Sequence, residues 1–352
     1  MIVSRAPYRV SFFGGGTDYP EWFQEHGGCF LSSAIDHHIS IVLRRKPALD
    51  KFRYRVVWRE LEDAENVSAI KHPFVRAALE ERHLPTGLDI VYFGDLPHGA
   101  GLGSSSTFGV AFLAALNAFS ELESTRYDLA REVYRIERDL LGETVGIQDQ
   151  FAAAFGGFNF GRIAKNGDVT MERVSLPGKR LQELSDRLVF VFTGVSRHAS
   201  NVAASKVQNF AKKEASLHRM AAMAHEARDI LTNGSDLDGF GELLHESWML
   251  KRSLSDQVAP TIVDEIYDVA RQEGVIGGKL LGAGGGGFMM LYVKDGDKER
   301  ISQHLDHLVQ VPVKLDAAGP QIVVNMPQKY SSHYDQVWQK TITNGITSRK
   351  QP

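Results

Sequence analysis

The segment Pro97–Ser106, with the sequence PHGAGLGSSS, constrains the fold of this chain more than any other. It follows Gly87–Phe93, where the pattern predicts a strand. It precedes Phe108–Phe119, whose residues are small and apolar on every side, which predicts a buried helix. Glycines lack a Cβ, so their N–H groups can face an anion, and a helix N-terminus adds unpaired N–H groups and a positive dipole end. We therefore expect an anion-binding loop, although a glycine-rich turn without a ligand has the same pattern.

The serines that close this segment add hydroxyl groups to the expected site. Ser104, Ser105 and Ser106 can bond phosphate oxygens or ligate Mg²⁺. No lysine follows the last glycine, so the segment is not the G-x-x-x-x-G-K-[ST] loop. We expect a metal ion and the helix dipole to neutralise more of the phosphate charge than they do in that loop.

The remaining composition excludes several classes of protein. The 352 residues carry a formal net charge of −3 without a run of five basic residues, which argues against a nucleic-acid or membrane-surface partner. Cys29 is the only cysteine, so an internal disulfide and a cysteine-based metal site are both excluded. Met1–Pro7 lacks the apolar core of a signal peptide, and no apolar stretch is long enough to span a bilayer. We expect a cytoplasmic protein, and the 13 histidines show no paired-ligand spacing.

Hydrophobic patterns divide the chain into two domains near residues 180–187. We assign 1–183 to an N-terminal domain, 184–330 to a C-terminal domain and 331–352 to a tail. The patterns predict helices and strands in both domains. The predicted strands are Ile2–Phe13, 39–43, 52–58, 87–93, 187–194, 288–293, 311–314 and 321–325, and the predicted helices are 72–83, 108–119, 128–141, 200–231, 237–254, 260–273 and 297–308.

Two further glycine-rich segments accompany Pro97–Ser106. Arg5–Tyr19 reads RAPYRVSFFGGGTDY, and Leu280–Gly287 reads LLGAGGGG. In this order and at these separations the three segments resemble the motifs of the GHMP superfamily of small-molecule kinases, which includes galactokinase, homoserine kinase and mevalonate kinase. The resemblance covers almost the whole chain. It implies an α+β, two-domain GHMP kinase fold, with an N-terminal ribosomal protein S5 domain 2-like α/β domain and a C-terminal ferredoxin-like domain, and it implies ATP and Mg²⁺ as cofactors.

The same resemblance implies a role for individual residues in phosphoryl transfer. Asp149, in the segment GIQDQ, would be the catalytic base, and Arg9 would lie beside the attacking hydroxyl and the γ-phosphate. Glu137, twelve residues before Asp149, would bind Mg²⁺ together with Ser105. The nucleotide would be held by Gly99, Ala100, Gly101, Leu102, Gly103, Ser104, Ser105 and Ser106.

The substrate would contact the other two segments. The residues implied are Gly15, Gly16, Thr17, Asp18, Gly284 and Gly285, and Asp18 would accept hydrogen bonds from sugar hydroxyls. Arg197 and Arg5 are candidates for a phosphate of the substrate itself, because arginine binds phosphate bidentately.

Each of these residues also has a purely structural interpretation. Asp149 suits a helix N-terminus, and Glu137 suits a solvated, salt-bridged helix face. Arg9 suits an exposed strand edge, and Asp18 suits an Asx-turn. Gly284–Gly287 suits a tight turn between a helix and a strand.

Within the superfamily, the variant FGGGTD at Phe13–Asp18 is similar to bacterial D-glycero-α-D-manno-heptose 7-phosphate kinases, as is Phe192–Arg197. Galactokinases have Glu-His in place of Gly15-Gly16. The resemblance implies phosphorylation of the anomeric hydroxyl of heptose 7-phosphate to the 1,7-bisphosphate, for nucleotide-activated heptose synthesis toward surface polysaccharide. Alternatives are a kinase for a galactose-, fucose- or hexosamine-type sugar, a decarboxylase of the mevalonate diphosphate type, or a non-catalytic sugar- and ATP-binding regulator. The sequence leaves the oligomeric state open, and a homo-oligomer is one of the possibilities.

Overall fold

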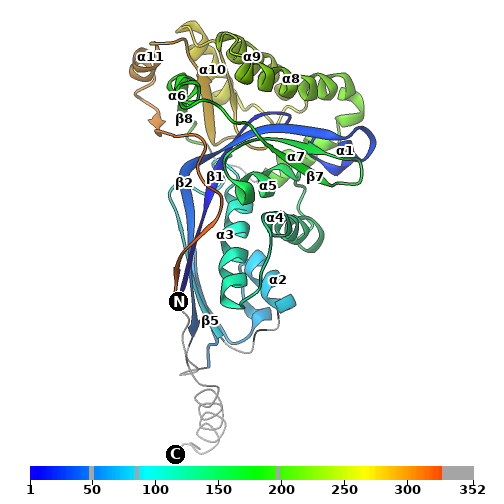
Figure 1. The fold of residues 1–352 in the computed structure, drawn as a ribbon, viewed down its shortest axis with the longest axis vertical. Helices are drawn as coiled ribbons and strands as arrows, with labels where there is room; N and C mark the ends of the chain where they lie inside the picture. Colours follow the sequence, from blue (N-terminus) through cyan, green and yellow to red (C-terminus); the bar gives the residue numbers. More distant parts are fainter. Residues whose placement is uncertain (47–50, 83, 85–86, 196–198, 327–352) are drawn as a thin grey trace, which may run out of the picture.

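The longest strands of the protein build a sheet that runs through its N-terminal half (Figure 1). A computed structural model describes residues 1–46, 51–82, 84, 87–195 and 199–326. Within them, eight strands form this sheet in the order β12-β1-β2-β5-β3-β4, with β6 pairing to β2 and β7 to β6. The strands are β1 (Ile2–Phe13), β2 (Gly28–Lys46), β3 (Tyr54–Val57), β4 (Leu61–Ala64), β5 (Gly87–Gly94), β6 (Phe158–Ile163), β7 (Val169–Arg173) and β12 (Gln321–Asn325).

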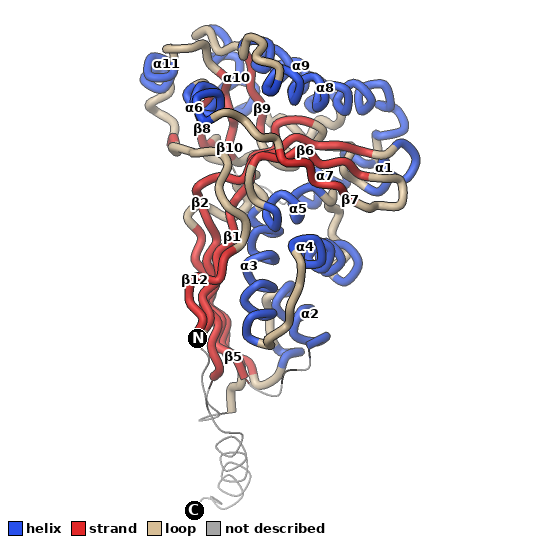
Figure 2. Tube along the Cα trace, viewed as in Figure 1, coloured by secondary structure: helices blue, strands red, loops and turns tan. Residues whose placement is uncertain are grey.

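Helices α2, α3, α4 and α5 cover one face of the long strands (Figure 2). The α3 helix lies against β1 and β2 and buries most of its residues, as its all-apolar sequence predicts. The other helical segments of this half are short. The helical segments of this half, α3 included, are α1 (Pro20–His26), η1 (Val67–Ala69), α2 (Pro73–Arg82), α3 (Ser104–Phe119), α4 (Arg126–Arg135), the π-helical turn η2 (Ile136–Leu140) and α5 (Gln148–Phe155).

A smaller antiparallel sheet organises the C-terminal half, in the order β11-β8-β10-β9. Its strands are β8 (Leu188–Phe192), β9 (Gly277–Leu280), β10 (Phe288–Tyr292) and β11 (Val309–Gln310). Its helices are α6 (Gly178–Asp186), α7 (Ala199–Val207), η3 (Phe210–Lys213), α8 (Glu214–Thr232), α9 (Asp238–Ser253), α10 (Thr261–Gln272) and α11 (Lys298–His304). Two sheets with helices packed on them confirm the expected two-part α+β fold. Within the described residues, no helix has both the length and the apolar character that a membrane crossing requires.

Several predicted boundaries were wrong. The buried helix begins at Ser104 rather than Phe108, because left-handed Gly103 (φ 77°) turns the chain directly into it. The continuous helix predicted over 200–231 is interrupted between α7 and α8, where the Asn209 side chain donates to the carbonyl oxygens of Ser205 and Leu254. The strand predicted over 311–314 is a loop.

The last predicted strand belongs to the other sheet. We expected 321–325 in the C-terminal domain, but β12 pairs antiparallel with β1, placing Asn325 opposite Ile2. Leu315 also bridges to Ile35, so the chain has already returned to the first sheet there. The segment 315–325 therefore completes the N-terminal half, and the predicted tail 331–352 lies outside the described residues.

Close backbone contacts join the two halves at the glycine-rich segments. The Phe288 N–H donates to the Ala100 carbonyl oxygen at 2.9 Å. A Cβ added to Gly101 (φ 79°) would lie 2.6 Å from the carbonyl oxygen of Leu281, so only glycine fits this crossing. The segment Pro97–Ser106, which we call the phosphate loop, and the third glycine segment, Leu280–Gly287, are thereby fixed against each other at the edge of one pocket.

Candidate active site

One pocket of about 510 Å³ collects residues from all three glycine-rich segments. Gly15 and Gly16 line it from the first segment, Gly99, Gly101 and Gly103 from the second, and Gly284 from the third. The first turns of α3 and α5 and one face of α7 complete the wall. The three segments resembling GHMP motifs are therefore brought together.

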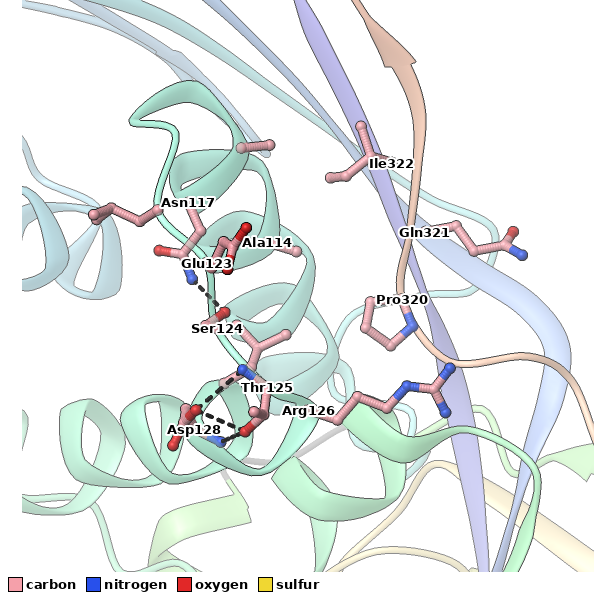
Figure 3. Close-up of a pocket in the computed structure, with 13 residues that line it drawn as sticks. Ala114, Asn117, Glu123, Ser124, Thr125, Arg126, Asp128, Pro320, Gln321 and Ile322 are labelled. Atoms are coloured by element: carbon pink, nitrogen blue, oxygen red, sulfur yellow. Dashed lines mark hydrogen bonds between the residues drawn. The ribbon is translucent and has the colours of Figure 1, made fainter.

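A second hollow, of about 610 Å³, lies between the α3–α4 connection and β12 (Figure 3). Its polar groups are already used in local structure. Thr125 and Asp128 form the capping box of α4, and Asn117 donates to Ser124 at 2.9 Å. None of the expected site residues lines it, so the 510 Å³ pocket is the better candidate.

The phosphate loop presents its glycines and serines to the pocket and turns its two apolar side chains inward. Gly99, Gly101 and Gly103 all have φ between 73° and 79°, a range that favours glycine. The side chains of Ala100 and Leu102 are buried. The backbone carbonyls of these two residues hold the loop in place. The Leu102 carbonyl accepts a hydrogen bond from the Arg9 N–H at 3.1 Å, and the Ala100 carbonyl accepts one from the Phe288 N–H.

Glu137 is buried beside the N-terminus of α3, not solvated as the salt-bridge interpretation required. Its carboxylate accepts hydrogen bonds from the hydroxyls of Ser105 at 2.6 Å and Ser106 at 3.0 Å, and from the Gln150 amide at 2.6 Å. Burial raises the pKa of this carboxyl to about 7, against the effect of the hydroxyl and amide donors. No basic group within the described residues pairs with this carboxylate.

A π-helical turn explains why the helical periodicity failed at this point. The pattern predicts a buried stripe that includes Ile136 and Leu140. The chain instead widens into the π turn η2, which leaves Leu140 45% exposed and Glu137 only 1% exposed. Single π turns are frequent at functional sites because they rotate the following residues out of α-helical register.

Arg9 and Asp149 form a bidentate pair across the pocket. The guanidinium donates from Nε to Oδ1 at 2.8 Å and from Nη2 to Oδ2 at 2.5 Å. Its Nη1 donates to the carbonyl oxygen of Gly101 at 2.8 Å, which ties this pair to the phosphate loop. Arg9 is buried, so it is not an edge-strand surface charge, and Asp149 stands in the first turn of α5 with a third of its side chain exposed.

Asp18 is also buried and lines the same pocket. Its Oδ1 accepts a hydrogen bond from the Gly16 N–H at 2.8 Å, which is an Asx-type contact within the first segment. Burial, and then the nearby Asp149 charge, raise the pKa of Asp18. Gly146 packs directly on this carboxylate, since a Cβ there would lie 2.0 Å from Asp18 Oδ2.

Other expected substrate residues do not reach the pocket. The Thr17 hydroxyl donates to the carbonyl of Gly14 at 2.8 Å and lies within 2.9 Å of the Cys29 carbonyl, so it holds the loop. The Gly285 N–H donates to the Val258 carbonyl. Arg5 donates to Gln321 on the exposed β1–β12 pair, which removes it as a candidate for a phosphate in this pocket. Arg197 lies outside the described residues.

Three buried lysines of the pocket were missed in the sequence. Lys251 donates to the carbonyls of Leu280 and Gly282, and Lys279 donates to the carbonyl of Phe12. Lys206, on α7, makes no side-chain hydrogen bond to a described residue, and its ammonium lies 5.5 Å from the Tyr19 ring centroid. Burial lowers the pKa of Lys206 to about 8 and that of Lys279 to about 7. Of the three lysines, Lys279 alone has a sequence signal for burial, because it stands in the run Gly-Gly-Lys-Leu-Leu of an apolar strand.

This arrangement suits phosphoryl transfer. Backbone amides at a helix N-terminus can cradle phosphates, and a buried carboxylate with two hydroxyls offers the oxygen ligands that Mg²⁺ prefers. A second carboxylate, that of Asp149, is paired to the Arg9 guanidinium and lines the same pocket. Such reactions depend chiefly on positioning and on neutralising charge, and the pocket supplies groups for both.

Comparisons with known proteins agree with this interpretation. The chain matches the family models "GHMP kinases N terminal domain" over residues 68–157 and "GHMP kinases C terminal" over 221–308. It is 29% identical over 304 residues to a D-glycero-alpha-D-manno-heptose 7-phosphate kinase of Campylobacter jejuni, covering 83% of this chain and 89% of that one. A bifunctional fucokinase/GDP-fucose pyrophosphorylase of Arabidopsis thaliana is 29% identical over 88% of this chain, which spans only 31% of that protein.

A solved structure is similar to this chain over nearly its whole length. The crystal structure of a D-glycero-D-manno-heptose 1-phosphate kinase from Bacteroides thetaiotaomicron superposes with a TM-score of 0.76 at 25% identity, covering 93% of this chain and all of that one. The two family models together span half of the chain, one in each half of the fold. The chain therefore belongs to the GHMP kinase family and is an ATP-dependent kinase.

Proposed function

We propose that this kinase transfers the γ-phosphoryl group of ATP to the anomeric hydroxyl of D-glycero-α-D-manno-heptose 7-phosphate, giving the 1,7-bisphosphate. The observation that carries the proposal is the pairing of two groups in one pocket. Asp18 offers a buried carboxylate to sugar hydroxyls, and Lys206 offers a buried ammonium with no hydrogen bond to a described residue. A sugar phosphate would bind both groups, with its hydroxyls on Asp18 and its phosphate on Lys206. Two relatives with heptose kinase names, at 29% and 25% identity, support the same sugar class.

The nucleotide would lie along the phosphate loop, with its phosphates facing the N–H groups of Gly99–Ser106. Glu137 and the Ser105 hydroxyl would hold Mg²⁺ together with phosphate oxygens. The fit is good, because a fully buried carboxylate without a basic partner is stabilised by a divalent cation, and Oε1 of neighbouring Gln150 has no hydrogen-bond partner among the described residues. When bound, the ion supplies neutralisation of the charge on the transferring group.

Asp149 would accept the proton of the anomeric hydroxyl as the oxygen attacks phosphorus. The new O–P bond forms while the bond from phosphorus to the bridging oxygen breaks, and ADP leaves with that electron pair. Arg9 orients the Asp149 carboxylate and holds a positive charge beside the developing negative charge. The non-catalytic regulator is disfavoured, because Asp149, Arg9, Glu137 and Ser105 all converge on the pocket.

Gly15, Gly16 and Gly284 would let the sugar approach the backbone closely, with Asp18 bonding its hydroxyls. Lys206 replaces Arg5 as the candidate for the 7-phosphate. Arg197 lies outside the described residues and stays a candidate from the sequence alone.

An ADP-release assay with a panel of acceptors tests the proposal. The panel holds heptose 7-phosphate, unphosphorylated heptose, galactose, fucose, a hexosamine and mevalonate. We expect the highest kcat/KM for heptose 7-phosphate, with a new anomeric phosphate in the ³¹P spectrum of the product. Turnover of heptose 7-phosphate no faster than that of the other acceptors removes this substrate, and equal turnover of the unphosphorylated heptose removes the role of Lys206.

A further inference from the structure

Two histidines and a glutamate that are far apart in the sequence meet on the surface, away from the pocket. His26 ends helix α1, while Glu214 and His218 stand one turn apart at the start of α8. One ligand atom from each, a ring nitrogen or a carboxylate oxygen, lies within 4.8 Å of the other two. Among the described residues, this is the one group of three or more such side chains with that geometry.

We propose that His26, Glu214 and His218 form a binding site for a transition-metal ion of the Zn²⁺ or Ni²⁺ class. Imidazole and carboxylate are the ligands such ions take, and two ligands on one tetrahedral zinc lie roughly 3.3 Å apart at the usual bond lengths. Nε2 of His218 already lies 3.5 Å from Oε1 of Glu214. The side chains of Glu214 and His218 are more than half exposed, so small rotations bring the third ligand within reach and leave a position for water.

The aromatic neighbours hold the two imidazoles toward each other. The Trp22 ring stacks on His26 with centroids 4.1 Å apart and meets the edge of His218 at 4.9 Å. The two imidazoles stand nearly perpendicular, 5.0 Å apart. Neither they nor Glu214 makes a side-chain hydrogen bond to another described residue, and the ion pairs of His26 with Glu25 (3.7 Å) and of His218 with Glu214 are longer than a hydrogen bond. The nitrogens are therefore free to ligate.

Such an ion would fasten together two helices that lie next to the loop carrying Gly16 and Asp18. Helix α1 directly follows the loop that carries Gly16 and Asp18. Leu217, next to His218, packs on that same loop, because a Cβ on Gly16 would lie 3.0 Å from its Cδ2 atom. A bound metal would tie α1 to α8 and thus hold this loop against the C-terminal half.

Titration of the tag-free, EDTA-treated full chain with Ni²⁺, without nucleotide, tests the site. Trp22 lies against the proposed ligands, so we expect a saturable quench of tryptophan fluorescence with one ion per chain, reversed by EDTA. We also expect Zn²⁺ to raise the Tm, since a ligand that binds only the folded state stabilises it. Mg²⁺ should not compete, because it prefers oxygen ligands.

Variants assign the effect to these residues. His26→Ala, His218→Ala and Glu214→Gln should each weaken Ni²⁺ binding by at least about tenfold, the lower end of what even the loss of an outer-shell partner costs. Trp22→Phe should lose the quench but keep the Zn²⁺ shift in Tm. The control is His304→Ala, which removes an exposed histidine 3.3 Å from Glu273 at a distance from the cluster. The proposal fails if the wild-type chain shows no saturable binding, or if His304→Ala weakens binding as much as His26→Ala.

Discussion

The Arg9 guanidinium holds both carboxylate oxygens of Asp149, at 2.8 and 2.5 Å, while its third nitrogen bonds the phosphate loop at Gly101. The proposed base, the proposed electrostatic group and the proposed ATP-binding loop are therefore one hydrogen-bonded unit. Groups that act as a unit give non-additive effects when they are removed separately. This has a direct consequence for mutants of the pair.

Replacing Asp149 by Asn should lower kcat by about 10²–10⁴-fold, the usual range for a lost general base, while ATP binding stays near normal. The double variant with Arg9→Met should cost little more than the worse single variant. Steady-state kinetics and nucleotide titration measure both. The matched control is Asp63→Asn, which breaks a bidentate pair with Arg55 on the β3–β4 hairpin and should leave kcat unchanged. An unchanged kcat in Asp149→Asn would make this residue structural.

Glu137→Gln should shift the Mg²⁺ activation curve to higher concentrations at fixed ATP. The carboxylate is buried and accepts hydrogen bonds from Ser105 and Ser106, so its removal should weaken the proposed metal binding without opening the fold. Activity at saturating Mg²⁺ should recover in part. Glu132→Gln, on α4 and paired to Arg82, is the control, and its curve should match that of the wild type. Identical curves for the two variants would exclude Glu137 as a ligand.

Hydrophobic patterns predicted two domains, because apolar periodicity is a local property. The resemblance of the three glycine-rich segments to GHMP motifs implied the α+β fold and the meeting of these segments at one site. The sequence did not predict burial of Glu137, since a π turn changes the helical register and leaves no mark in the residue pattern. It also missed Lys206 and Lys251, whose helices have ordinary mixed composition. Their burial is set by tertiary packing, since the Lys206 ammonium lies 5.5 Å from the Tyr19 ring centroid and Lys251 donates to the carbonyls of Leu280 and Gly282.

The placement of β12 was wrong, and the histidine cluster was not predicted, for a related reason. Pairing of Ile2 with Asn325 joins the two ends of the described chain, and no local pattern encodes so distant a partner. His26 and His218 are separated by 192 positions, whereas sequence motifs for metal sites have ligands only a few residues apart. Contacts of this kind become visible only when the fold is known.

Gly146→Ala should raise the KM for the sugar without raising that for ATP. A Cβ at this position would lie 2.0 Å from Oδ2 of Asp18, so the carboxylate must move from its hydrogen bond with Gly16. Asp18→Asn should give a similar change in KM, because both variants alter the same proposed sugar contact. The Gly142→Ala control has open space around its Cβ and a positive φ of 68°, so any loss there reports backbone strain alone. A normal sugar KM in Gly146→Ala would contradict the role of Asp18.

Gly101→Ala should destabilise the protein by about 1–3 kcal/mol, because φ is 79° and the added Cβ would lie 2.6 Å from the Leu281 carbonyl oxygen. The crossing of the two halves would loosen, and the ATP KM should rise with it. Chemical denaturation and kinetics measure the two effects. Gly178→Ala, at the open start of α6, should instead be neutral or stabilising. Equal stability of the two variants would show that the crossing tolerates a side chain.

Lys206→Met should raise the KM for the phosphorylated sugar at least about tenfold, the usual size of a lost charge-assisted hydrogen bond, and leave the ATP KM unchanged. Burial lowers the pKa of Lys206 to about 8, while Asp18 and Asp149 oppose that shift. The ammonium is therefore charged below about pH 8 and neutral above it. In the wild type, kcat/KM for the sugar phosphate should fall as pH rises through 8, and in Lys206→Met this fall should disappear.

The lowered pKa of Lys206 affects the free energy of unfolding in the opposite direction to its effect on kcat/KM, since stability rises with pH. The pKa of Lys206 in the folded chain lies below its unfolded value of 10.5, so the buried charge costs stability below about pH 8, and this cost is relieved as pH rises toward 10.5. Lys206→Met should thus gain stability over the wild type at pH 7 and lose that advantage near pH 10. Lys212→Met, which removes an exposed lysine of η3, should change neither profile. A wild-type kcat/KM that stays flat through pH 8, with a Lys206→Met variant of unaltered KM, would rule out Lys206 as the phosphate-binding group.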